Sequence, residues 1–457
     1  MYRRVAIIGG GAAAAALLSE LAERAPPGAA LHLDWYTGGG RPGRGVAYGT
    51  DSPRHLLNVR AASMGMFTGK PQGFLDYARR LDPSLAGTDF LPRRLYGDYL
   101  ESEVARALAL ARARGVDVRV VPFAADALVP EADGVTVVRG EEQARADAAV
   151  LALGALPAQP LAGVDADALA GGRYVTDPWA LLAQPSTVPA PEQAVVIGLG
   201  LTAVDVLLEL AARWPATHFV ALSRHGRLPE SHLPAASAPA DDGGALVDAL
   251  REAPQLRRWL RLLREAAAAS ADWRTVIDSL RPHTQGLWAE LPAEERARFL
   301  RHARWAWERA RHRMPPQVAE EITALERAGR LERRRGRVQA VRAAGADRLR
   351  VTLAPARGRP AQTLEGGLVV QTVGLDTDLR RTAHPLLRQL VVNGHALPDP
   401  LGLGVQAEPD GRLRHDGEAW PRLFAIGSLL RGTLWESTAM PEIRQQARSL
   451  AERLLAG

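Results

Sequence analysis

Two segments of the chain carry the same local pattern: a short apolar run, a glycine turn and an apolar helix. They are VAIIGGGAAAAALLSELA at residues 5–22 and AVVIGLGLTAVDVLLELAA at residues 194–212. A buried parallel strand that enters a helix through a glycine turn is typical of a dinucleotide-binding βαβ unit. The sequence therefore predicts an α/β fold with two dinucleotide-binding Rossmann-like domains.

The first glycine turn has the spacing Gly9-x-Gly11-x-x-Ala14. In such a fingerprint the first glycine allows a tight turn, and the second lets a pyrophosphate approach the backbone. The third small residue lets helix and strand pack closely. Free N–H groups at the helix N-terminus then favour the anion. We expect a cofactor site at Gly9, Gly11 and Ala14, with a ligand-free glycine turn as the alternative.

The second turn repeats this spacing, and an acidic residue follows in the helix. The next predicted strand, residues 218–226, contains Arg224 near its end, where an aspartate or glutamate often holds a ribose. An arginine there favours a 2′-phosphate and hence NADP(H), although a plain surface arginine is the alternative. The predicted nucleotide contacts of this turn are Gly198, Gly200, Ala203, Asp205 and Arg224.

The first unit also departs from the usual fingerprint at its second strand. Residues 31–37 end in Tyr36 and Thr37, whereas Asp34 lies inside the strand. The ribose-binding acid of the fingerprint is therefore missing, and whether Thr37 replaces it stays open.

The positions of the two turns predict a split domain with an insertion. Apolar runs that end in glycine recur at 148–157, 367–375 and 422–455, and we expect them to close the two nucleotide folds. We expect an FAD-binding domain from residues 1–160 and 365–457, an NAD(P)-binding domain at 190–360, and a helical insert at 244–327.

Composition limits the chemistry. The 457 residues include no cysteine, which excludes disulfide, thiolate and iron–sulfur chemistry. Histidines show no metal-ligand spacing, so no metal is expected. The formal net charge is +6, but the densest basic run, residues 330–338, has no interleaved aromatic residue. We interpret it as a solvated face and expect no nucleic-acid partner. Glycines interrupt both long apolar runs, so we expect a cytoplasmic protein without a membrane segment.

Four stretches carry a family resemblance. The chain resembles a bacterial family of FAD/NAD(P)-binding monooxygenase-like proteins, which includes an FAD-dependent urate hydroxylase and nitrosuccinate-forming aspartate N-hydroxylases. It is more distantly similar to ornithine and lysine N-hydroxylases. The stretches are GRGVAYGTDSPRHLLNVRAASMGMF (43–67), FLPRRLYGDYLESEV (90–104), SRHGRLPESHLP (223–234) and GTLWESTAMPEIRQQA (432–447).

This resemblance implies a flavin site built from separate segments. Turn capping by Asn58 and packing by Trp435 are the structural alternatives, and core packing is expected for most tryptophans of the helical insert. A substrate role for Arg313 stays open. The resemblance implies catalytic positions at Arg94, Tyr96, Trp435 and Glu436, and flavin contacts at Asn58, Arg60 and Gly427.

Two dinucleotides on one chain indicate hydride transfer from NAD(P)H to FAD. Because the chain has no cysteine, thioredoxin- and glutathione-reductase activities are excluded. Dioxygen, a quinone or a protein remains as the electron acceptor. The resemblance favours an O2-dependent monooxygenase acting on a small molecule, with urate, converted to 5-hydroxyisourate, as the best single substrate. The alternatives are an amino acid or amine N-hydroxylase, an electron-transfer flavoprotein, and a nucleotide-binding regulator without turnover. The choice between NADH and NADPH and the oligomeric state stay open.

Overall fold

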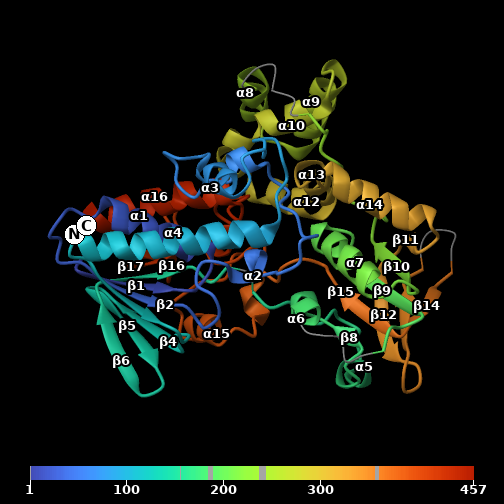
Figure 1. Ribbon diagram of the computed structural model, residues 1–457, viewed down its shortest axis with the longest axis horizontal. Helices are drawn as coiled ribbons and strands as arrows, with labels where there is room; N and C mark the ends of the chain where they lie inside the picture. The colour runs from blue at the N-terminus through green and yellow to red at the C-terminus, as the bar shows by residue number, and fades with distance from the viewer. Residues whose placement is uncertain (1, 155, 184–188, 236–242, 356–359, 457) are drawn as a thin grey trace.

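The computed structural model describes residues 2–154, 156–183, 189–235, 243–355 and 360–456. Two mainly parallel sheets form two neighbouring domains, and a group of helices stands above them at one side (Figure 1). The α/β class with two dinucleotide-binding domains is thereby confirmed.

The first sheet has the strand order β16-β17-β7-β1-β2-β3. The central strand β1 is flanked by parallel partners, and its residues Val5 to Ile8 are almost fully buried. Such unbroken apolar runs are expected where helices or further layers cover both faces of a sheet. The strands are β1 (Arg4–Ile8), β2 (His32–Tyr36), β3 (Asp117–Val121), β7 (Ala148–Leu151), β16 (Arg412–His415) and β17 (Glu418–Ala425).

A separate hydrophobic core lies on each face of this sheet. Helices α1 (Ala12–Arg24), α4 (Arg93–Ala113) and α16 (Met440–Ala456) pack in one hydrophobic core. The opposite core contains residues of a three-stranded antiparallel sheet and of helix α15 (Pro385–Val392). The antiparallel strands are β4 (Ala127–Glu131), β5 (Gly134–Arg139) and β6 (Glu142–Ala146).

The second sheet has the order β11-β10-β9-β15-β8. Helices α7 (Leu201–Arg213) and α14 (Pro316–Arg327) share one hydrophobic core against it, which includes Leu207 and Ile322. The strands are β8 (Tyr174–Val175), β9 (Gln193–Ile197), β10 (His218–Ser223), β11 (Leu331–Arg335) and β15 (Leu368–Gln371), with a separate antiparallel sheet of β12 (Val338–Ala343), β13 (Leu349–Leu353) and β14 (Gln362–Gly366).

Two predicted boundaries are wrong. The sequence pattern predicts that the segment from residue 365 belongs to the first domain, but β15 pairs in parallel with β9 and so belongs to the second sheet. The pattern also predicts that residues 316–327 belong to the insert, but the buried Val318 of α14 packs in the core of α7. Both errors arise because an apolar run predicts a strand or a buried helix face, but it does not indicate which strand or which core that element packs against.

The helical insert is therefore α8 to α13. Its apolar residues form two small cores, one of which contains Trp288 from the insert and Trp435 from the C-terminal segment. The insert helices are α8 (Gly244–Glu252), α9 (Leu256–Ala269), α10 (Trp273–Ser279), α11 (Thr284–Glu290), α12 (Ala293–His302) and α13 (Arg304–Arg311). The remaining α-helices are α2 (Gly45–Tyr48), α3 (Gly73–Leu81), α5 (Ala166–Ala170) and α6 (Pro178–Ala183).

A polar contact joins α7 of the second domain to the first domain. Arg93, at the start of α4, forms an ion pair with Asp205 at 2.8 Å. Ser52 donates a hydrogen bond of 2.6 Å to Glu209. Among the described residues no helix is both long and apolar enough to cross a bilayer.

Candidate cofactor and substrate site

The first glycine turn has the geometry that its sequence predicts. Gly9 has φ 127°, and a Cβ there would lie 2.2 Å from the carbonyl oxygen of Ala152. Gly11 forms the N-cap of α1 and no side chain caps that end. A Cβ on Gly11 would meet only Gly45, at 3.6 Å. The backbone donors of the first helical turn are therefore left for a ligand, and a pyrophosphate fits them.

The third small residue of the turn, Ala14, is fully buried in the core beneath α1. The closing strand β17 ends beside the same helix, because a Cβ on Gly427 would lie 3.6 Å from the Cβ of Ala13. Gly427 has φ 82° and its N–H donates to Gln446 at 2.9 Å. The structure thus brings Gly427 to the first glycine turn, as expected.

The end of β2 offers no carboxylate to a ribose. Asp34 is buried and bonds Arg4 at 2.7 Å. Thr37 is also buried, and its hydroxyl donates to the carbonyl of Val121 at 3.4 Å. Thr37 is therefore no replacement for the missing acid.

The second turn repeats the geometry of the first. Gly198 has φ 123°, and a Cβ there would lie 2.4 Å from the carbonyl oxygen of Thr372. Gly200 forms the uncapped N-terminus of α7, and nothing lies within 4 Å of a Cβ at this position. Ala203 is fully buried. The backbone donors at the N-terminus of α7 therefore also fit a pyrophosphate.

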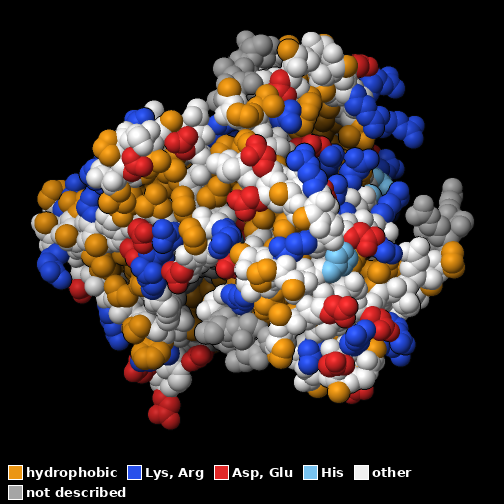
Figure 2. Space-filling view, turned by 45° about the vertical axis from the view of Figure 1, so that its right-hand side comes forward, with side chains coloured by type: hydrophobic (Ala, Val, Ile, Leu, Met, Phe, Trp, Pro, Cys, Tyr) orange, Lys and Arg blue, Asp and Glu red, His pale blue; other side chains and the backbone are white. Residues whose placement is uncertain are grey.

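A cavity of about 670 Å³ opens at this second turn. Arg224 and Arg337, both exposed, line it at the carboxyl ends of the neighbouring strands β10 and β11. His225 stacks on Trp305 of α13, with ring centroids 4.1 Å apart, so the insert forms one wall. Figure 2 shows basic side chains gathered on the side of the second domain and the insert. The cavity is of ligand size and suits an anionic nucleotide.

Asp205 does not face this cavity. Burial raises the pKa of its carboxyl group, and the charge of Arg93 offsets part of that rise. The ion pair with Arg93 is itself buried, with side chains 14% and 7% exposed. The predicted cofactor contact of Asp205 is therefore corrected: the residue joins the two domains.

Asn58 and Arg60 also connect the domains. The carbonyl of Asn58 lies 3.2 Å from Nε2 of His232. The Arg60 guanidinium donates to the carbonyls of Thr88 and Leu233, at 2.7 and 2.8 Å. These bonds fix the segment that the resemblance places beside the flavin, while a direct flavin contact of either residue stays a prediction.

Arg94 and Tyr96 lie on different sides of α4. Arg94 is exposed, whereas Tyr96 is fully buried between Tyr48 and Phe74, with ring centroids 4.6 and 4.9 Å away. Burial raises the pKa of the Tyr96 hydroxyl. The surroundings of Tyr96 are those of a packing residue, so the structure does not bring this pair together as a catalytic unit.

Trp435 and Glu436 connect the C-terminal segment to the insert. Trp435 is 2% exposed and stacks on Trp288 at 4.8 Å. Glu436 has φ 64°, and its carboxylate accepts bonds from Trp307 Nε1 and Arg311 Nε, at 2.7 and 3.0 Å. A positive φ at a residue other than glycine is costly unless its contacts hold it. The two predicted catalytic residues are thus anchored beneath the insert.

Sequence reasoning missed Arg337. This residue lies in the basic run 330–338, which was interpreted as a solvated face, yet it lines the cavity beside Arg224. The signal was available, since two neighbouring parallel strands both end in arginine. Among the described residues, no group of three or more potential ligands could hold a metal ion.

Two glycine turns, each with a free helix N-terminus, define the class: a two-dinucleotide α/β protein. Residues 6–156 match the model of a family described as FAD-NAD(P)-binding. This match confirms the expected cofactor class for the first domain. A search of curated proteins finds no match.

Solved structures match nearly the whole chain. An ornithine N-hydroxylase from Kutzneria sp. 744, with reduced FAD, NADP+ and L-ornithine, is 17% identical, with 99% of each chain covered and a TM-score of 0.66. An L-lysine 6-monooxygenase from Pseudomonas syringae has the same identity and coverage and a TM-score of 0.67. A cadaverine monooxygenase from Erwinia amylovora, bound to FAD, is 13% identical over 100% of this chain and 95% of its own, with a TM-score of 0.64. The chain therefore shares the fold of these proteins.

Proposed function

We propose that the protein is an FAD-dependent NAD(P)H monooxygenase that hydroxylates the amino group of a small amine or amino acid. The observation that carries the proposal is the full-length fold shared with three hydroxylases whose names include ornithine, lysine and cadaverine. The absence of cysteine also argues against a disulfide reductase. This likeness favours amine hydroxylation over the urate hydroxylation expected first.

The residues of the chain have separate parts in such a reaction. The uncapped N-termini of α1 and α7 bind the two pyrophosphates, and Arg224 with Arg337 binds the nicotinamide nucleotide. FAD, when bound, supplies hydride acceptance and the activation of dioxygen. Trp305 belongs to the insert and lines the nucleotide cavity, so the insert contributes one wall of the nucleotide site.

The test is substrate-dependent NAD(P)H oxidation by the purified FAD-loaded protein. Amines and amino acids are compared with urate, while oxygen uptake, peroxide and hydroxylamine product are measured. We expect an amino compound to accelerate oxidation and to form a hydroxylamine with little peroxide. Urate loss matched one-to-one by NAD(P)H oxidation would restore urate as substrate. Quinone reduction without substrate-stimulated oxygen uptake would point to an electron-transfer flavoprotein.

A further inference from the structure

A buried guanidinium with free donors lies where the insert meets the two domains. Arg313 is 2% exposed, and its Nη2 donates to the carboxylate of Asp278. Its Nε and Nη1 are buried and have no hydrogen-bond partner among the described residues. Arginine carries five N–H donors and stays charged, so unpaired donors in such a place are destabilising. The Nε and Nη1 groups of Arg313 can therefore donate hydrogen bonds to a ligand acceptor.

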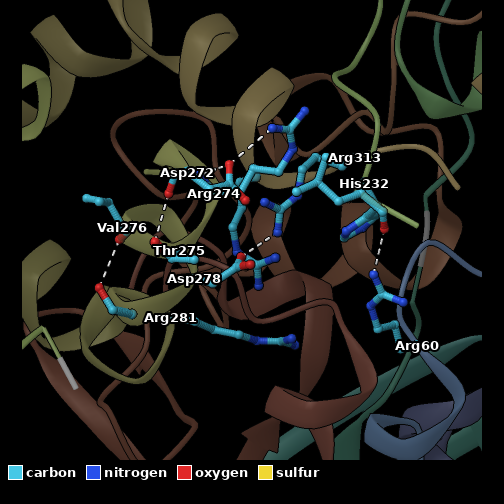
Figure 3. Close-up of polar contacts among 12 residues, drawn as sticks. Arg60, His232, Asp272, Arg274, Thr275, Val276, Asp278, Arg281 and Arg313 are labelled. Atoms are coloured by element: carbon cyan, nitrogen blue, oxygen red, sulfur yellow. Dashed lines mark hydrogen bonds and ion pairs between the residues drawn. The ribbon is translucent and has the colours of Figure 1, made fainter. Parts of the chain in front are cut away.

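The backbone holds Arg313 in place. Met314 forms a parallel bridge with Ser231, in which the Met314 N–H donates to Glu230 at 2.7 Å. The N–H of His232 donates back to Met314 at 2.9 Å. Arg313 is thereby fixed beside His232 (Figure 3). His232 also contacts the backbone carbonyl of Asn58. The guanidinium thus lies close to the segment expected to line the flavin.

A second guanidinium, that of Arg60, lies within electrostatic reach of Arg313. Burial lowers the pKa of Arg60, and the charge of Arg313 is the second cause. The hydrogen bonds of the Arg60 guanidinium go to backbone carbonyls. Burial foremost lowers the pKa of His232 to about 4, so this ring is neutral at pH 7. Asp278 is the carboxylate in contact with Arg313, and its side chain is 39% exposed. The charges of Asp278 and Asp89 offset part of the lowering of the Arg60 pKa, so Asp278 acts on both guanidinium groups.

Neighbouring arginines differ from Arg313 in their unpaired nitrogens. Three guanidinium groups of the insert near Arg313 each pair with a carboxylate, as Arg313 does with Asp278, but none of them has a buried nitrogen without a partner among the described residues. The pairs are Arg274 with Asp272, Arg281 with Glu442 and Arg311 with Glu436. Arg313 stands out because two of its three nitrogens are unpaired although it is as buried as any of these.

The neutral imidazole of His232 adds a second recognition element. Its Nε2 lies 3.2 Å from the carbonyl oxygen of Asn58, so Nε2 carries the hydrogen. The other nitrogen, Nδ1, is then an acceptor. An acceptor beside a guanidinium suits a molecule that has both a carboxylate and an amino group.

We propose that Arg313 binds a carboxylate of the substrate, which makes the substrate an amino acid rather than a diamine or urate. The inference rests on the proposed function. It separates the solved relatives into those named for ornithine or lysine and the one named for cadaverine, which has no carboxylate. The free Nε–H and the free Nη1–H lie on different edges of the guanidinium, and a carboxylate oxygen accepts a charge-assisted hydrogen bond from either of them.

The test measures binding by calorimetry with the FAD-loaded protein. Matched probes are L-ornithine against putrescine and L-lysine against cadaverine, with L-aspartate and urate added. We expect at least one carboxylate-bearing probe to bind about tenfold or more tightly than its amine, and Arg313→Gln to remove this difference. Equal binding of the paired probes, unchanged affinity in Arg313→Gln, or no binding of any carboxylate would overturn the inference.

Arg274→Gln is the matched control, because it removes the same charge nearby from a guanidinium that has no buried unpaired donor within the described part of the chain. It should change the affinity by less than about threefold, since Arg274 bonds Asp272 and the carbonyl of Ser231 and has no such donor for a ligand. Arg313→Lys keeps the charge but loses the guanidinium donors, and it should keep its FAD and bind with intermediate affinity. Carboxylate binding without hydroxylation would contradict the proposed function alone. Hydroxylation of a diamine as fast as its amino acid would contradict only this inference.

Discussion

The two glycine turns have nearly the same backbone and different surroundings. Gly9 and Gly198 have φ values of 127° and 123° and would each place a Cβ against a carbonyl of the neighbouring strand. After the next strand, however, the first domain has the buried Thr37 and the second has the exposed Arg224. The glycine spacing therefore predicts the turn, and the flanking residues determine which nucleotide it suits.

A second difference lies in the helices behind the turns. The seventh residue after Gly9 is Ala16, which is fully buried in an apolar core. The seventh residue after Gly198 is Asp205, whose buried carboxylate pairs with Arg93 of the first domain. Helix α1 serves its own domain, whereas α7 also holds the two domains together.

Removal of Arg93 tests this second difference and should have the largest effect. Arg93→Ala leaves Asp205 buried without its cation, and we expect a loss of about 3–5 kcal/mol in the free energy of unfolding. Burial already raises the pKa of Asp205, and loss of Arg93 raises it further. The loss should thus be smaller at pH 5 than at pH 7.5, because the protonated carboxyl needs no cation. Chemical denaturation at both pH values measures the loss in the free energy of unfolding.

The double variant Arg93→Ala/Asp205→Ala is the companion experiment. It removes both charges and should be more stable than Arg93→Ala alone. Arg54→Ala, which removes a half-exposed arginine 4.0 Å from Glu209, should cost less than about 1 kcal/mol. An Arg93→Ala protein as stable as the parent at pH 7.5 would contradict the role given to this contact.

Alanine at the first glycines tests whether the two turns are equivalent. Gly9→Ala and Gly198→Ala each add a Cβ within 2.4 Å of a backbone oxygen at a positive φ. Each should lower stability by about 1–3 kcal/mol or more. Gly9→Ala should reduce FAD content, and Gly198→Ala should raise KM for the nicotinamide nucleotide. Thermal unfolding measures the stability, the absorbance ratio of flavin to protein measures the FAD content, and steady-state kinetics measure KM.

The controls are Gly11→Ala and Gly200→Ala. Both residues have ordinary extended backbone, and an added Cβ has space there. These variants should fold normally and weaken only nucleotide binding. If Gly200→Ala lowered stability as much as Gly198→Ala, the turn would not have the geometry described.

The smallest effect concerns the choice of coenzyme. Arg224→Ala should raise KM for NADPH about tenfold or more, since a charged hydrogen bond contributes about 1.5–3 kcal/mol, and should leave KM for NADH nearly unchanged. Arg337→Ala should act in the same direction, as it lines the same cavity. Steady-state kinetics with both coenzymes measure the difference. Equal changes for NADPH and NADH would argue against a phosphate contact.

Local patterns predicted the fold well and the site only partly. Both turns and the closing position of Gly427 follow from residues near in sequence, whose geometry the backbone dictates. Asp205, Tyr96 and Arg337 were misjudged because burial and ion pairing depend on segments far away in the chain. The partner of Asp205, for example, lies 112 positions earlier, at Arg93, and no spacing within α7 indicates it.

The first domain is built from segments that lie far apart in the sequence. The Tyr2 N–H bonds the Leu454 carbonyl at 3.3 Å, α1 packs on α16, and the termini lie side by side (Figure 1). During synthesis β9 and β10 emerge before β17 and α16. Strands of the second sheet are therefore available before the elements that complete the first domain. A protein truncated before β17 would therefore lack part of its first sheet while keeping every strand of its second sheet.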